Sequence, residues 1–334
     1  LKIINKGDRE PNFISVSAGA IIDGIKITSW DPYSNDTIKQ NVNGSIPRPY
    51  IIFKNADGNV NISNSEIAFL GYNSYPSNGL VFVGGGSKSL LVNNTIHDMW
   101  DGFSSHSAEF IKIIKNEFYN NNRSGIYTDS GSHDLDIIGN LAYDNSKMGI
   151  ICAENCYNIL FDRNVVHDNG IAGLMFSRNT TNSTAINNYA YNEKVGISIY
   201  SSSNNTAYDN LLKSSDKGIF IGANSSHNHI FNNSLVNDTI GIDVSNFAKD
   251  NVVKNNIISN VIINSDQAHE SMNKKISIYG CESIDDFEYL HCDPFKSEFE
   301  GNSTYYNSTK IMDITRDPFY VDGTSGKAIE FIDR

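Results

Sequence analysis

The chain has 334 residues, a formal net charge of −12 and a sequence pI near 5.0. This acidic balance, without any basic cluster, excludes a surface that binds nucleic acid. No apolar run reaches the ~18 residues that a membrane-spanning helix needs, so we expect no transmembrane segment. Because the chain exceeds the size of one typical globular core, we expect an elongated domain that grows by repetition.

A repeat of nearly constant length dominates the sequence. Residues 1–50 contain strand-like pieces, such as Ala20 to Ile27, and a polar segment at 31–47 interrupts them. Further along, glycine-centred segments return every 22 to 24 residues and begin at Gly79, Gly102, Gly125, Gly149, Gly173, Gly196, Gly218 and Gly241. A second column holds Asn94, Asn116, Asn140, Asn164, Asn188, Asn210 and Asn233. This recurrence predicts one supersecondary unit stacked on itself.

The repeat predicts an all-β fold, a right-handed parallel β-helix. Its length is too short for two helices and a turn, and its apolar residues alternate with the period of two that is typical of strands. Leucine-rich repeats have a similar length, but their Leu-x-x-Leu-x-Leu pattern is absent. The asparagine column is expected to bond its own turn and the asparagine of the next coil. We predict an N-terminal cap with the first coils at 1–50, the β-helix at 51–260, and an irregular C-terminal capping tail at 261–334.

Sequons and cysteines favour a secreted or cell-surface glycoprotein. Candidate glycosylation sites are Asn35, Asn43, Asn302 and Asn307, although an asparagine-rich ladder also creates such motifs by chance. Cys281 and Cys292 lie in the tail at a spacing that suits a disulfide across a short loop. Cys152 is expected to be buried, with Cys156 as an alternative partner.

Ionisable residues concentrate on one predicted face. After each glycine, the positions are expected to point alternately inward and outward, so that side chains of successive coils form rows about 4.8 Å apart. One outward row contains Ser104, Tyr127, Ile151, Met175, Ser198, Phe220 and Asp243, and the next contains His106, Asp129, Ala153, Ser177 and Tyr200, with Glu154 and Arg178 beyond. This pattern indicates a groove-like site for a linear polymer.

Several segments resemble the mannuronan (alginate) C5-epimerases, which are β-helices with carbohydrate-binding and sugar-hydrolase repeats. The resemblance runs over about residues 45 to 245 and includes Arg48 to Ile51, Asp98 to Phe103 and Gly173 to Arg178. It implies an extracellular enzyme that acts on a linear acidic polysaccharide of uronic acid and requires no cofactor. It also implies that Arg178 and Tyr200 bind substrate.

The catalytic motif departs from that of the epimerase family. The family strand looks like Tyr-Gly-Ile-Asp-Pro-His-Asp, whereas residues 124–130 read Ser-Gly-Ile-Tyr-Thr-Asp-Ser. The family histidine therefore falls on Asp129, and an arginine of the following coil falls on Glu154. Fold is expected to be inherited more safely than activity.

C5 epimerisation requires one group to remove a proton next to a carboxylate and another to return one from the opposite face. We predict His106 as the base, Asp129 as the carboxylate that orients it, and Tyr127 as the acid. Asp101 and Glu154 join Arg178 and Tyr200 as candidate substrate-binding residues.

Other functions would use the same face. A lyase would need only the His/Tyr pair, and a hydrolase would use two carboxylates. Asp129 and Glu154, with Asp101 nearby, could instead hold Ca²⁺. A non-catalytic glycan-binding or structural β-helix at the cell surface is the competing class.

Overall fold

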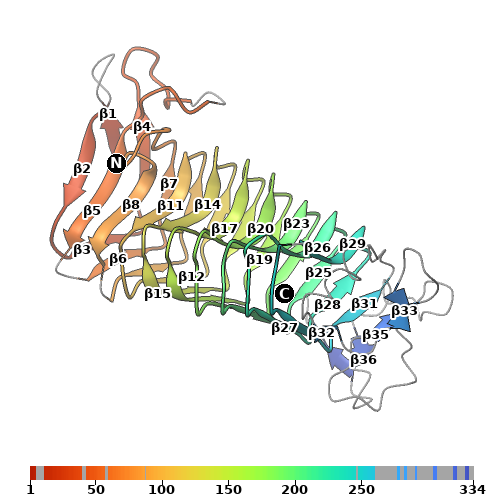
Figure 1. The fold of residues 1–334 in the computed structure, drawn as a ribbon. Helices are drawn as coiled ribbons and strands as arrows, with labels where there is room; N and C mark the ends of the chain where they lie inside the picture. The colour runs from red at the N-terminus through yellow and green to blue at the C-terminus, as the bar shows by residue number, and fades with distance from the viewer. Residues whose placement is uncertain are drawn as a thin grey trace.

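The computed structural model describes residues 1–4, 11–39, 43–56, 59–86, 88–245 and 247–259, together with several short strands beyond residue 259. All regular elements in these ranges are strands, and no helix occurs in them. The strands follow one another around an elongated solenoid (Figure 1). No helix in this part of the chain is long and apolar enough to span a membrane.

Three long sheets form the sides of the solenoid. Sheet A contains β1 (Lys2–Ile4), β4 (Lys26–Trp30), β7 (Glu66–Ala68), β10 (Thr95–His97), β13 (Glu117–Tyr119), β16 (Leu141–Tyr143), β19 (Val165–His167), β22 (Tyr189–Tyr191), β25 (Leu211–Lys213), β28 (Ser234–Val236), β31 (Ile257–Ser259) and β35 (Thr304–Tyr306). Sheet B contains β2 (Phe13–Val16), β5 (Tyr50–Ala56), β8 (Gly79–Gly85), β11 (Asp101–His106), β14 (Ser124–Asp129), β17 (Met148–Cys152), β20 (Ala172–Ser177), β23 (Val195–Tyr200), β26 (Lys217–Ile221) and β29 (Ile240–Val244). Sheet C contains β3 (Ala20–Asp23), β6 (Val60–Ser63), β9 (Leu90–Val92), β12 (Lys112–Ile114), β15 (His133–Ile138), β18 (Tyr157–Asp162), β21 (Thr184–Ile186), β24 (Thr206–Tyr208), β27 (His229–Phe231), β30 (Val252–Lys254) and β32 (Ser277–Ile278). Two short antiparallel pairs, β33 (Glu282–Ser283) with β34 (Leu290–His291) and β36 (Phe319–Val321) with β37 (Ala328–Glu330), follow.

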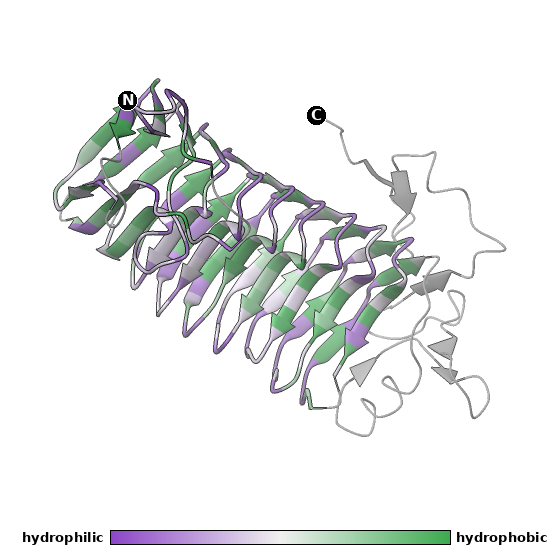
Figure 2. Ribbon diagram, turned by 90° about the horizontal axis from the view of Figure 1, so that it is seen from above, coloured by the Kyte–Doolittle hydropathy of each residue, from purple (hydrophilic) through white to green (hydrophobic). Residues whose placement is uncertain are grey.

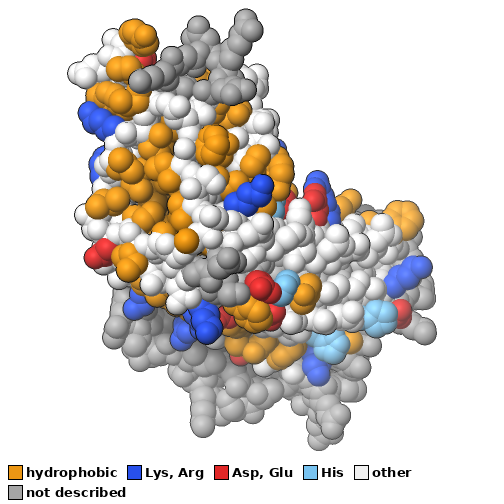
Figure 3. Space-filling model, turned by 90° about the vertical axis from the view of Figure 1, so that its left-hand side faces the viewer, with side chains coloured by type: hydrophobic (Ala, Val, Ile, Leu, Met, Phe, Trp, Pro, Cys, Tyr) orange, Lys and Arg blue, Asp and Glu red, His pale blue; other side chains and the backbone are white. Residues whose placement is uncertain are grey.

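Each coil adds one strand to each sheet, and the pairing within the three sheets is parallel. The predicted parallel β-helix is therefore confirmed. The division at residues 50 and 260 stays a prediction, although strands β1 to β4 already belong to the three sheets. The side chains of Leu1, Phe13 and Ile21, in the first strands, are exposed. Hydrophobic side chains also gather on the N-terminal end of the solenoid (Figure 3).

Hydrophobic residues lie on the strands, and hydrophilic residues are frequent in the turns between them (Figure 2). The buried core runs through the coils and includes stacked rings such as Phe53 and Phe82, whose centroids are 4.8 Å apart. The glycine column has a steric cause. A Cβ at Gly125 would lie 2.7 Å from the carbonyl oxygen of Gly149, which is closer than real Cβ atoms approach.

The asparagine column forms a buried ladder of side-chain hydrogen bonds. Asn140 donates from Nδ2 to Asn164 Oδ1 at 3.0 Å and to the carbonyl of Ile113 at 2.8 Å. Its Oδ1 accepts from the backbone N–H and the Nδ2 of Asn116. The same cross-coil bond continues to Asn256. The expected structural role of this column is confirmed.

A second ladder occupies another turn and was not predicted. Asn121, Asn145 and Asn169 bond one another in sequence, and Asn169 then donates from Nδ2 to Glu193 Oε1 at 2.7 Å and from its backbone N–H to Oε2. Burial raises the pKa of Glu193 to about 8, against these bonds. Asp238 occupies the same ladder position two coils after Glu193, and burial raises its pKa to about 7. Burial in this ladder thus disfavours the charged form of both acids.

A buried arginine ties the polar segment at 31–47 to the coils. Arg48 is fully buried and donates to the carbonyls of Gly71 at 2.8 Å, Leu70 at 3.0 Å and Ile38 at 3.4 Å. Burial lowers its pKa to about 9. The exposed Asn35 and Asn43 lie in or beside this segment, and their glycosylation stays a prediction. Cys281, Cys292, Asn302 and Asn307 lie outside the described residues.

Replacing Asn140 by alanine should lower the free energy of unfolding by about 3 kcal/mol, because several buried backbone and amide groups lose their partners. Chemical denaturation would measure the change. The matched control is Asn73→Ala, because Asn73 is exposed and its side-chain amide makes a hydrogen bond of only 3.5 Å, to the carbonyl of Asn43, while its backbone bond to Gly44 is kept in the variant. Equal stability of the two variants would contradict a structural role for the ladder.

The pH dependence of stability should report on Glu193. Its folded pKa lies above its unfolded value, so its contribution is fully present below about pH 4.5 and is lost as the pH rises through about 8. Glu193→Gln should therefore flatten the fall in Tm between pH 5 and pH 9, measured by calorimetry. Part of the fall in Tm with pH should remain in this variant, because the raised pKa of Asp238 contributes to it as well. An unchanged slope would show that Glu193 is already ionised at low pH.

Candidate functional site

The outward rows expected from the sequence lie in register on sheet B. Ser104 pairs with Tyr127, Tyr127 with Ile151, and Ile151 with Met175. In the neighbouring row, His106 pairs with Asp129, and Ser177 pairs with Tyr200. The structure therefore places the predicted residues on one face. Their charged side chains, however, form separate contacts: His106 with Asp129, Asp101 with Arg123, and Glu154 with Arg178.

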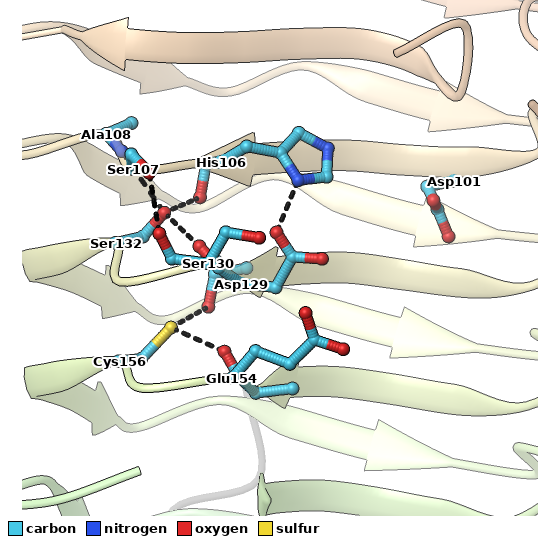
Figure 4. Close-up of polar contacts among 12 residues, drawn as sticks. Asp101, His106, Ser107, Ala108, Asp129, Ser130, Ser132, Glu154 and Cys156 are labelled. Carbon is cyan, nitrogen blue, oxygen red and sulfur yellow. Dashed lines mark hydrogen bonds and ion pairs between the residues drawn. The ribbon is translucent and has the colours of Figure 1, made fainter. Parts of the chain in front are cut away.

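His106 and Asp129 form a buried pair across adjacent coils. The Nδ1 of His106 contacts Asp129 Oδ1, and the two residues are 6% and 7% exposed (Figure 4). The Nε2 of His106 is buried and has no hydrogen-bond partner among the described residues. When Nδ1–H of a neutral His106 donates a hydrogen bond to the Asp129 carboxylate, the lone pair of the imidazole lies on Nε2. The pair thus provides an oriented base.

Tyr75 covers part of this histidine. Its ring meets the His106 ring edge to face, with centroids 4.6 Å apart and an interplanar angle of 88°. The tyrosine lies in the segment between β7 and β8 and is 64% exposed. Sequence analysis missed Tyr75 because this segment lies outside the repeat, and its approach to His106 depends on how the chain leaves the coil.

Asp101 does not face a substrate, which corrects its predicted binding role. It is fully buried, and Arg123 donates to both of its carboxylate oxygens. The Ser124 backbone N–H also donates to Asp101 Oδ1, at 3.3 Å. Burial nevertheless raises the pKa of Asp101, with Arg123 opposing the shift. The role of Asp101 is to hold Arg123 in place.

Arg123 lies beside the predicted site, and the sequence analysis missed it. Its guanidinium lies 3.9 Å from the centroid of the Tyr127 ring, and its side chain is 20% exposed. Burial raises the pKa of Tyr127 to about 12, with Asp129, Glu154 and Asp101 acting in the same direction and Arg123 opposing them. Tyr127 is therefore protonated near neutral pH. The position of Arg123 directly before β14, at the edge of the outward face, was the available signal.

Further cations occupy the same edge of sheet B. Lys147 directly precedes β17 and Lys194 directly precedes β23, and both are exposed. The backbone N–H of Lys147 bonds the carbonyl of Arg123 at 2.8 Å, which shows that these residues occupy equivalent positions on adjacent coils. Ile171 occupies this position on the coil between Lys147 and Lys194, so the positive charges lie on three of four successive coils.

The predicted carboxylate cluster is not formed. Glu154 pairs with Arg178 at 2.6 Å, with 42% and 63% of the two side chains exposed. Asp129 contacts His106 (Figure 4), and Asp101 contacts Arg123, so each of the three carboxylates has a different partner. Within the described ranges, no group of three or more His, Cys, Asp or Glu side chains could hold a metal ion. Ca²⁺ binding at Asp129 and Glu154 stays a prediction.

A mostly buried apolar cluster on the outer side of sheet B separates the His106 region from the later coils. It contains Met148, Ile151, Ala153, Ala172 and Met175, which pack with Tyr127 outside the main core. Cys152 lies on the opposite, inward side of β17, and both Cys152 and Cys156 are buried free thiols. Burial of Cys152 is therefore confirmed, whereas its pairing with Cys156 in a disulfide is wrong.

The fold and this face define a parallel β-solenoid protein. The family model described as periplasmic copper-binding protein (NosD) matches residues 11–189 and 59–263, which together span most of the chain. The protein therefore belongs to the NosD family. No curated protein sequence matches it.

Solved structures with the same fold include carbohydrate-active proteins. The periplasmic alginate epimerase AlgG is 20% identical, with a TM-score of 0.64, and the match covers 77% of this chain and 68% of AlgG. For an AlgG mutant, the chain spans 64% of that protein's length. The A-module of the Azotobacter vinelandii mannuronan C-5 epimerase AlgE6 is 17% identical, with a TM-score of 0.51 and 75% coverage of both chains. A GH136 lacto-N-biosidase from Eubacterium ramulus is 11% identical, with a TM-score of 0.55, 80% coverage of this chain and 61% of its own. These similarities establish the fold.

The copper named in the family description does not fit the described coils. Soft thiolate ligands favour Cu(I), but the two thiols are buried in the core. Burial raises the pKa of Cys152 well above its usual value, which disfavours the thiolate that a metal requires. We therefore assign no step to a metal.

Arg123→Met should destabilise the protein by about 3 kcal/mol, because it leaves the buried Asp101 carboxylate without a cation. The free energy of unfolding near pH 7 would measure this loss. Asp101→Asn in the same background should recover part of it, since the stranded charge disappears. A double variant as unstable as Arg123→Met would contradict this explanation.

Proposed function

We propose that this protein modifies an acidic polysaccharide and acts as a C5-epimerase-like enzyme on a polymer of uronic acid. The observation that carries the proposal is the buried His106 Nε2, which has no partner among the described residues and is held by Asp129 beside Tyr127. This arrangement supplies a base and an acid on neighbouring strands, and a sugar bound between them would meet the two groups from opposite faces of C5, as inversion next to a carboxylate requires.

His106 removes the proton from C5 of the sugar. The C5–H bond breaks, its electron pair moves into the adjacent carboxylate group, and the proton passes to Nε2. The contact with Asp129 then stabilises the imidazolium. Because the carboxylate and imidazole lie on neighbouring coils, the strand register fixes their geometry before substrate binds.

Tyr127 returns a proton to C5 from the opposite face. Its raised pKa, about 12, keeps the hydroxyl protonated before this transfer. Arg123, over the Tyr127 ring, provides the positive charge that stabilises both the developing enolate and the tyrosinate. Proton exchange with water then restores both side chains, so solvent hydrogen enters the product at C5.

The cationic edge supports an acidic substrate. Arg123, Lys147 and Lys194 follow the long axis of the solenoid, which suits repeated carboxylates along a polymer. NosD and AlgG are both described as periplasmic, which supports an extracytoplasmic location for this protein. Secretion and attachment to the cell surface remain alternative forms of this proposal.

A polysaccharide lyase is the second candidate, because elimination begins with the same proton abstraction by His106. A hydrolase is less favoured, since Asp129 and Glu154 have separate cationic partners. The non-catalytic alternative is a glycan-binding β-helix with the same charged edge. These functions predict different products.

Proton NMR of the protein with polymannuronate in D₂O distinguishes them. We expect deuterium at C5 and new guluronate signals, and a rate that falls by about 10²- to 10⁴-fold in His106→Ala. The control is His229→Ala, because His229 is exposed on sheet C.

Olefinic signals would identify a lyase, and new reducing ends without unsaturation would identify a hydrolase. An unchanged spectrum from a protein that still binds the polymer would contradict catalysis and favour the binding module.

A further inference from the structure

A second polar and aromatic cluster lies on the same face as His106, several coils away. Lys217 begins β26, Phe220 lies in the same strand, and Asp243 of β29 pairs in register with Phe220. Tyr127 and Phe220 belong to one row, with Ile151, Met175 and Ser198 between them. Four coil spacings place the second cluster about 19 Å from Tyr127.

The contacts in this cluster leave one buried acceptor unused. The Nζ of Lys217 contacts Asp243 Oδ2 and lies 4.7 Å from the centroid of the Phe220 ring. Asp243 is 4% exposed, and its Oδ1 is buried without a hydrogen-bond partner among the described residues. A buried carboxylate oxygen without a donor is costly, so a hydroxyl donor from a ligand would stabilise it. Lys217, whose side chain is 34% exposed, can donate further bonds to the same ligand.

A glycine makes room for two aromatic rings beside these polar groups. A Cβ at Gly222 would lie 2.3 Å from Tyr200 Cδ2 and 3.1 Å from Phe220 Cε1. The Tyr200 ring therefore lies directly over the Gly222 backbone. Tyr200 is 42% exposed, and the Phe220 ring beside it borders the Lys217 side chain.

We propose that Lys217, Phe220, Asp243 and Tyr200 form a distal subsite for a sugar residue of the polysaccharide whose modification is proposed above. This inference rests on that proposed function. Asp243 Oδ1 accepts a hydrogen bond from a sugar hydroxyl, and Lys217 donates to a hydroxyl or carboxylate oxygen. The Tyr200 and Phe220 rings pack against the C–H groups of the sugar. A few directed polar groups beside apolar surface are typical of ligand sites.

The separation of the two clusters sets the ligand size. A polymer that occupies both sites must cross the apolar residues Ile151 and Met175, and so must extend over four coil spacings. A disaccharide can fill only one site, whereas a longer oligomer gains the second without a new association step. Affinity should therefore rise with chain length until both clusters are occupied.

Isothermal titration calorimetry with oligomannuronates, from dimer to octamer, tests the subsite. We expect Tyr200→Ala to weaken octamer binding roughly five- to tenfold while dimer binding stays unchanged. Gly222→Ala should act in the same direction, because its Cβ displaces the Tyr200 ring. The matched control is Tyr157→Ala, since Tyr157 is 38% exposed but belongs to sheet C.

Equal wild-type affinity for dimer and octamer would overturn the distal subsite, and so would a Tyr200→Ala effect of equal size on both. If length-dependent binding is lost in Tyr200→Ala but no deuterium enters C5 in wild type, the subsite stands and the proposed catalysis fails. If wild type binds no oligomer, both proposals are overturned.

Discussion

The in-register stacking of parallel coils is the constraint on which the rest of the structure depends. Each strand bonds the same strand of the next coil, so one residue position recurs along the solenoid axis. A buried polar side chain can then satisfy its hydrogen bonds through its equivalent above and below, as Asn116, Asn140 and Asn164 do. The Gly125 and Gly149 backbones approach so closely for the same reason. The ladder bonds persist although coil length varies from 22 to 24 residues, because the turns absorb the difference and the strands stay in register.

The candidate site uses this register directly. His106 and Asp129 come from different coils, yet the pairing of β11 with β14 places them side by side. Arg123 is fixed in a different way, because the buried Asp101 accepts from it at the edge of the sheet. A rigid scaffold can therefore hold catalytic groups without moving loops. Tyr75 is the exception, since it reaches His106 from a segment outside the repeat.

Buried polar groups without hydrogen-bond partners lower stability on the outward face of sheet B. The Ser104 and Ser124 hydroxyls, His106 Nε2 and Asp243 Oδ1 are buried on this face without partners among the described residues. Elsewhere in the described residues the same is true of Trp100 Nε1, Asp238 Oδ2 and Asn255 Oδ1, whereas the asparagine ladders are extensively bonded. Unsatisfied groups gathered on one face are expected where a ligand will bind. The buried acids Glu193 and Asp238 differ, because they lie in a ladder position and act on stability.

The sequence by itself determined the coil. The spacing of the glycines and asparagines, the alternation of apolar residues, and the outward rows of Ser104 and His106 all follow from local geometry repeated at one period. The pairings at the site were decided by tertiary structure. Asp101 forms an ion pair with Arg123, Glu154 forms one with Arg178, and the Tyr75 ring packs against His106. The sequence does not predict these contacts, because each side chain can reach several neighbours. A repeat states which row a residue occupies, but burial and competition among nearby partners select the contact that forms.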